Sequence, residues 1–195
     1  MRKVLTICSL LIGALWMAAL PALTQKTQTV AAPVDYKAVK AQLEIFQGLI
    51  NRNLQQSFAM PFALLQDAKG TYLPEFGMAF HLEANLFPIR VISPFDMRPY
   101  TPEELKKARD QKAQRIQDIR RTLSGLLLEN AKGLDALPAE QKIAIVVHLF
   151  NLPSEHHEDL PTQVVLETSR QSLMDAKNQG LTAETFQKQV TFLAF

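Results

Sequence analysis

Two groups of residues carry side chains that could do chemistry. The first is the run Glu155-His156-His157-Glu158-Asp159, in which every side chain can bind a metal ion or move a proton. Adjacent histidines point in different directions on an extended backbone, so the run lacks the i, i+4 spacing that puts two imidazoles on one helical face. Such a histidine-rich acidic loop could hold zinc or nickel. The alternative is a solvated turn between two strands.

The second group consists of His81, Glu83 and His148. Side chains alternate along a strand, so His81 and Glu83 share one face of an extended segment, while His148 belongs to another apolar run. If these segments are neighbours in one sheet, the three could form a set of two histidines and one carboxylate, or a histidine base oriented by an acid. The alternatives are a core histidine bonded to a carbonyl at 148 and a wetted strand face at 81 and 83.

The sequence beyond residue 24 lacks the other common catalytic signatures. None of its serines lies in a Gly-x-Ser-x-Gly elbow or a Ser-x-x-Lys pattern, and no glycine-rich phosphate loop follows a strand. The single cysteine, Cys8, lies near the N-terminus. We therefore expect no cofactor and favour a binding or structural protein over an enzyme. A metal-dependent or acid-base hydrolase that uses either histidine group is the alternative.

The N-terminus has the pattern of a secretory signal. A basic start, Arg2 and Lys3, precedes an uncharged run over residues 4–20, and small residues follow at Ala22 and Thr24. We expect a signal peptide over residues 1–24 and a periplasmic or extracellular location. An uncleaved membrane anchor is the alternative, because a bilayer-spanning helix needs about 20 apolar residues.

Removal of the signal changes the composition. Arg2 and Lys3 are two of 21 basic residues, so 19 basic residues are left against 19 acidic ones. Cys8 and the single tryptophan, Trp16, are lost as well, so no disulfide forms within the rest. The balanced charge gives no electrostatic reason to expect a nucleic acid as partner. Any membrane contact would use the N-terminal segment, if that segment is not cleaved.

The remainder reads as a polar tether over residues 25–34 and a single domain over residues 35–195. An amphipathic helix is predicted from Asp35, because apolar residues recur at steps of three and four. Its predicted core face is Val39, Leu43, Phe46, Ile50 and Leu54. Residues 58–65 and 71–86 are expected to form antiparallel strands joined by a hairpin loop at 67–70.

A long helix is predicted to begin at a capping box. Thr101 is placed as the N-cap, Pro102 at the first helical position and Glu104 three residues after the cap. The helix is expected to run to Lys132, with Gly133 as a left-handed stop. Its first half is basic and polar, so we expect it to project into solvent, or alternatively to meet an anionic surface.

The last third of the sequence predicts strands over 143–150, 164–166 and 190–195. The first is a continuous apolar run, which indicates a strand buried on both faces. Thr168 and Gln171 predict a capped helix that ends near Gly180, and residues 182–188 predict a further turn or two. The fold class expected is α+β: a mainly antiparallel sheet with helices packed on one face and one long central helix.

Residues 72–83 resemble a strand found in a group of uncharacterised exported bacterial proteins. Tyr72, Leu73, Phe76 and Gly77 supply its tyrosine-leucine-x-x-aromatic-glycine pattern, and Glu75 stands where the group commonly has a second glycine. The C-terminus is similar to the closing helix and strand of the same group, through Gly180, Phe186, Val190 and Phe192. The resemblance implies an exported bacterial protein and supplies no catalytic residues.

Taken together, the sequence favours an exported domain that acts by binding. We expect its partner to be another envelope protein or a second copy of itself. The contact is expected at an exposed sheet edge or on the polar half of the long helix.

Overall fold

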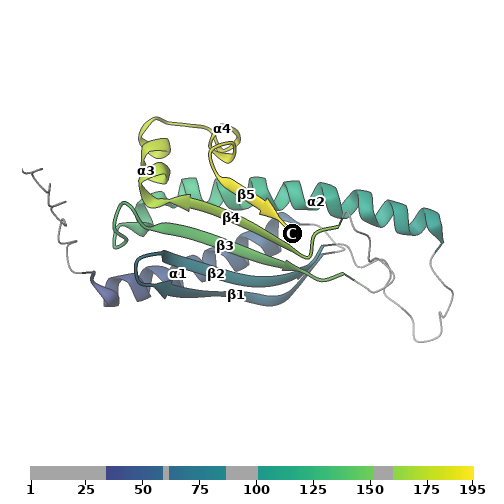
Figure 1. The fold of residues 1–195 in the computed structure, drawn as a ribbon, viewed down its shortest axis with the longest axis horizontal. Helices are drawn as coiled ribbons and strands as arrows, with labels where there is room; N and C mark the ends of the chain where they lie inside the picture. Colours follow the sequence, from purple (N-terminus) through teal and green to yellow (C-terminus); the bar gives the residue numbers. More distant parts are fainter. Residues whose placement is uncertain (1–33, 59–61, 87–100, 152–159) are drawn as a thin grey trace, which may run out of the picture. The chain divides into compact units, whose positions relative to one another are not determined.

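The computed structural model describes residues 34–58, 62–86, 101–151 and 160–195, all within one compact unit over residues 32–195 (Figure 1). In chain order, its elements are α1 (Tyr36–Ser57), β1 (Ala63–Leu73), β2 (Gly77–Asn85), α2 (Pro102–Glu129), the 3-10 turn η1 (Ala131–Leu134), β3 (Lys142–Leu149), β4 (Gln163–Ser169), α3 (Arg170–Asn178), α4 (Ala183–Gln187) and β5 (Thr191–Ala194).

The strands form a five-stranded sheet in the order β1-β2-β3-β4-β5. The β1–β2, β3–β4 and β4–β5 pairs are antiparallel. Only β2 and β3 run parallel, because the long helix α2 carries the chain back between them. This arrangement confirms the α+β class with a mainly antiparallel sheet, helices on one face and a long central helix (Figure 1).

The core lies between this sheet and the helices. All five predicted apolar positions of α1 are buried, so its predicted core face is confirmed. Alternation along β2 places Met78, Phe80 and Leu82 on the same side, each at most 1% exposed. Phe46 of α1 meets Phe80 there, with ring centroids 6.1 Å apart. The helices therefore attach to the sheet through a continuous apolar layer.

The prediction that β3 is buried on both faces was wrong. Ile143, Ile145 and Val147 face the core and are fully buried, whereas Val146 is half-buried and His148 is exposed on the other face. The near-continuous apolar run misled the prediction, because its outer positions Ala144 and Val146 are apolar although no described helix covers that face, where only the small Ala144 is buried. The sheet therefore has one covered face and one outer face.

The predicted hairpin loop at 67–70 was also misplaced, since β1 continues through it to Leu73. The turn lies at residues 74–76 and is closed by the Phe76 N–H, which donates to the Leu73 carbonyl at 3.1 Å. Gly70 serves close packing instead, because a Cβ there would lie 2.6 Å from Leu43 Cδ2 of α1. A glycine that reads as a turn signal is thus a contact point for a helix.

The start of α2 confirms the predicted capping box. The Thr101 side chain accepts from the Glu104 N–H at 3.2 Å, and Glu104 Oε2 accepts from the Thr101 N–H at 2.8 Å. The helix ends at Glu129 rather than Lys132, and Gly133 does not have a positive φ. The chain tightens into η1 instead, which buries Ala131 and Leu134 in the core.

The first half of α2 is less exposed to solvent than expected. Lys106 and Lys107 are exposed, but Ala108 and Lys112 are only 1% and 2% exposed. Lys112 Nζ donates to Asn151 Oδ1 at 3.2 Å, so its buried ammonium has a polar partner. The prediction that this half projects into solvent therefore holds for only some of its residues.

The N-cap of the helix after β4 lies one residue later than predicted. Ser169 is the N-cap of α3, and its hydroxyl accepts from the Ser172 N–H at 3.0 Å. Thr168 lies opposite Ile143 in the sheet and is 7% exposed, so it still belongs to the strand. Gly180, with φ of 67°, follows this helix as predicted.

Candidate functional site

The structure brings His81, Glu83 and His148 onto the same face of neighbouring strands. Glu83 of β2 lies directly opposite His148 of β3, and His81 lies opposite Val146. Both histidines are exposed on the outer face, and no described hydrogen bond or ion pair joins the three side chains. Within the described ranges, no three His, Cys, Asp or Glu residues gather closely enough to hold a metal ion. The three residues are therefore neighbours in the sheet, but their side chains do not form a common site.

The other sequence candidates, His156 and His157 with their acidic neighbours, lie outside the described residues. They stay a prediction.

The two edges of the sheet differ, and this difference defines the candidate site. At the β1 edge, side chains of α1 bond to backbone groups of the strand. The Ala68 N–H donates to Asn51 Oδ1 at 2.7 Å, and the Gly70 N–H donates to Gln47 Oε1 at 2.5 Å. Because these amides occupy positions that another strand would use, α1 closes this stretch of the edge.

The opposite edge, along β5, has outward main-chain groups. Phe195 and Gln163 exchange hydrogen bonds of 2.9 and 3.2 Å, so they are a hydrogen-bonded pair of the β4–β5 ladder. Such pairs alternate in antiparallel strands, and the register therefore makes Leu193 the next bonded residue of β5. The N–H and C=O groups of Phe192 and Ala194 consequently point away from β4. No described residue bonds to them there.

One row of the outer face beside this edge is apolar. Val146, Val165 and Leu193 lie in one row across β3, β4 and β5. Leu193 is 46% exposed, and Phe195, just after β5, is 65% exposed. Exposed large apolar side chains beside unpaired backbone groups are a favourable combination for contact with another chain.

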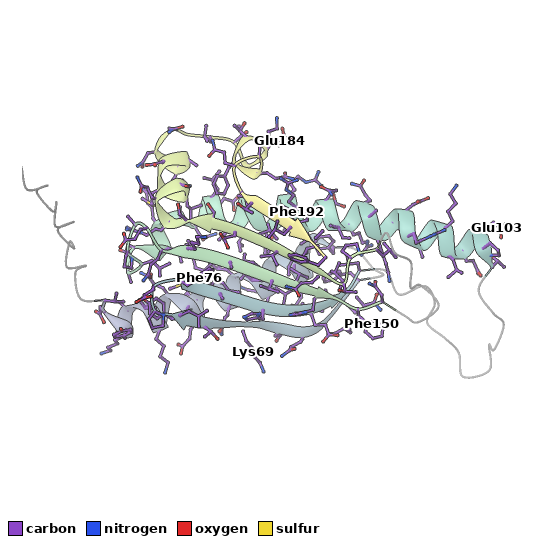
Figure 2. All side chains as sticks on the ribbon, viewed as in Figure 1. Lys69, Phe76, Glu103, Phe150, Glu184 and Phe192 are labelled. Atoms are coloured by element: carbon purple, nitrogen blue, oxygen red, sulfur yellow. The ribbon has the colours of Figure 1, made fainter. Side chains whose placement is uncertain are left out.

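The helix side of the β5 edge is basic. The Arg120 guanidinium of α2 lies 4.9 Å from the centroid of the Phe192 ring, and its Nη2 donates to the Gln187 carbonyl at 3.2 Å. A hollow of about 420 Å³ adjoins it, lined by Arg120, Arg121, Glu184, Gln187 and Lys188. Phe192 on β5 and Glu184 on α4 can be located in Figure 2. Arg120 thus contacts the edge strand and also lines the charged hollow.

Acidic groups only partly balance these bases. Arg121 pairs with Asp118 at 2.6 Å, and Glu184 lines the hollow. One turn earlier, burial lowers the pKa of the Arg115 guanidinium, and the Asp118 carboxylate opposes that shift. Arginine nevertheless stays protonated in proteins. The hollow therefore keeps a positive charge.

Sequence reasoning missed the residues that distinguish the two edges. Gln47 and Asn51 read as ordinary solvated positions of an amphipathic helix, although their i, i+4 spacing places them on one stripe. Arg120 reads as part of a basic run. Neither signal could be recognised without knowing that β1 lies beside α1 and that β5 lies beside α2.

The comparisons with known proteins add no functional information. No protein-family model matches the chain, and neither the curated proteins nor the solved structures gave a match. None of the helices in the described part of the chain has the length and apolar character needed to cross a membrane.

Proposed function

We propose that this chain is an exported, non-enzymatic binding domain of the cell envelope, which captures an extended segment of another polypeptide along the β5 edge. One observation supports it above all: the backbone groups of Phe192 and Ala194 point outward, while the N–H groups of Ala68 and Gly70 at the other edge are already bonded. Strand addition uses such outward groups for affinity and neighbouring side chains for specificity.

The cellular location rests on the N-terminal pattern. Residues 1–24 combine a basic start, an apolar run and small residues, which is typical of a cleaved export signal. The intact mass of the protein recovered from cells tests this part. A mass that lacks residues 1–24 supports export and release, whereas a full-length mass supports an anchor.

The contact itself can be tested with a photoreactive amino acid in the full-length chain. We expect a probe at Leu193 to crosslink to one polypeptide, and a control probe at Asp67, beside the closed β1 edge, to give no such product. A synthetic peptide of the crosslinked segment should then slow hydrogen exchange at the N–H groups of Phe192 and Ala194. Unchanged exchange at those two groups would contradict strand addition.

A further inference from the structure

The side chains of an added strand would meet two different surfaces. Residues alternate between the faces of a sheet, so every second residue of the added strand would lie on the outer face, beside Leu193 and Phe195. The residues between them would lie on the helix side, beside Phe192 and the Arg120 guanidinium that covers its ring. The two faces of the β5 edge therefore demand different residue types.

The helix side favours a carboxylate. Arg120, Arg121 and Lys188 line the hollow there against Glu184, and Asp118 pairs with Arg121. The Arg120 Nε is buried, and no described residue accepts a hydrogen bond from it. A carboxylate that bonds to a guanidinium forms a charge-assisted hydrogen bond, about twice as strong as a neutral one. An acidic side chain would add the negative charge that the hollow lacks.

A second copy of the chain fits this edge less well than an acidic segment of a different chain. Antiparallel pairing of β5 with its copy would place Arg120, Arg121 and Lys188 of both chains on the same side of the joined sheet, where like charges repel. The charge distribution therefore favours a different chain with acidic residues.

We propose that the β5 edge selects an extended segment in which acidic residues alternate with apolar ones. The acidic side chains face Arg120, Arg121 and Lys188, and the apolar ones face Leu193 and Phe195. This proposal rests on the proposed function and specifies the chemistry of the partner.

Three synthetic eight-residue peptides test the selection, each labelled for fluorescence anisotropy with the full chain. One alternates valine and glutamate, one alternates valine and lysine, and one has four glutamates followed by four valines. We expect the alternating glutamate peptide to bind at least about tenfold more tightly than the other two, and its affinity to fall as salt is raised.

Two charge-reversal variants locate the contact. Arg121→Glu with Lys188→Glu should weaken binding of the alternating glutamate peptide at least about tenfold. The matched control, Lys106→Glu with Lys107→Glu, makes the same charge change on exposed residues at the far end of α2 and should leave binding unchanged. Circular dichroism checks that both variants are folded.

The outcomes separate the two proposals. Equal binding of both alternating peptides, lost in Ala194→Pro, would overturn acidic selection and leave strand addition standing. Absence of binding by every peptide, with no effect of Ala194→Pro on the crosslink from Leu193, would overturn both proposals. Concentration-dependent dimerisation that Ala194→Pro abolishes would identify a second copy as the occupant and overturn the acidic partner.

Discussion

Asn51 Oδ1 accepts a hydrogen bond of 2.7 Å from the backbone N–H of Ala68, and this bond closes part of the β1 edge with a helix side chain. Ala68 is only 3% exposed, so water cannot readily replace Asn51 Oδ1 as the acceptor of its N–H. A helix side chain thereby protects the edge strand, next to the exposed charges of Asp67 and Lys69.

Asn51→Ala should destabilise the fold by about 1–2 kcal/mol, because it leaves the buried Ala68 N–H without an acceptor. The free energy of unfolding in urea measures this loss. Asn53→Ala is the matched control, because it makes the same change on the same helix. Among the described residues, Asn53 Oδ1 accepts from the exposed Ser57 hydroxyl alone, at 3.3 Å. An equal loss in both variants would show that the edge bond is not the cause.

Glu75→Gly should stabilise the fold by up to about 1 kcal/mol. Glu75 has φ of 69°, and the left-handed region costs a residue with a side chain about 1–2 kcal/mol, partly offset by the entropy that glycine loses on folding. Thermal unfolding measures the gain. Glu75→Ala keeps the strain and removes the charge, so a similar gain in that variant would refute the backbone explanation.

Gly77→Ala should destabilise by about 3 kcal/mol or more. Gly77 has φ of 127°, and an added Cβ would lie 2.0 Å from the Lys142 carbonyl oxygen, where β2 begins to pair with β3. Gly48→Ala in α1 is the control, because a Cβ there meets nothing within 4 Å and should stabilise the helix by about 1 kcal/mol. Chemical denaturation of both variants should show shifts of opposite sign.

Ser124→Ala should raise stability by about 1 kcal/mol. The Ser124 hydroxyl is fully buried on α2 and has no described hydrogen-bond partner, so its removal relieves a desolvation cost. Ser169→Ala, which removes the cap of α3, should instead lower stability by about 1 kcal/mol. A loss of stability in Ser124→Ala would mean that the hydroxyl has a partner, such as a bound water.

The parts of the fold that the sequence predicted correctly depend on local signals. The apolar spacing of α1 and the capping box at Thr101 and Glu104 involve residues a few positions apart, and both were confirmed. The role of Gly70 could not be predicted in this way. It depends on contact with Leu43, which is distant in sequence and approaches only after α1 has packed on β1.

The candidate site shows the same limit. Alternation correctly placed His81 and Glu83 on one face, but their position beside His148 depends on the parallel pairing of β2 with β3. No residue pattern in either strand specifies that order. The open β5 edge likewise follows from which strand ends the sheet, a property of the whole topology.

Proline substitutions in β5 test the register from which the open edge is derived. Leu193 bonds to β4 and Ala194 points outward, so Leu193→Pro should destabilise by about 2–3 kcal/mol, through a lost ladder bond and local strain, and Ala194→Pro by less than about 1 kcal/mol. Proline is tolerated at an edge position only where its missing N–H faces solvent. Urea unfolding of the two variants compares neighbouring residues with the same substitution. If Ala194→Pro were the more damaging change, the outward direction of its N–H would be wrong, and the β5 edge would not offer the groups that strand addition requires.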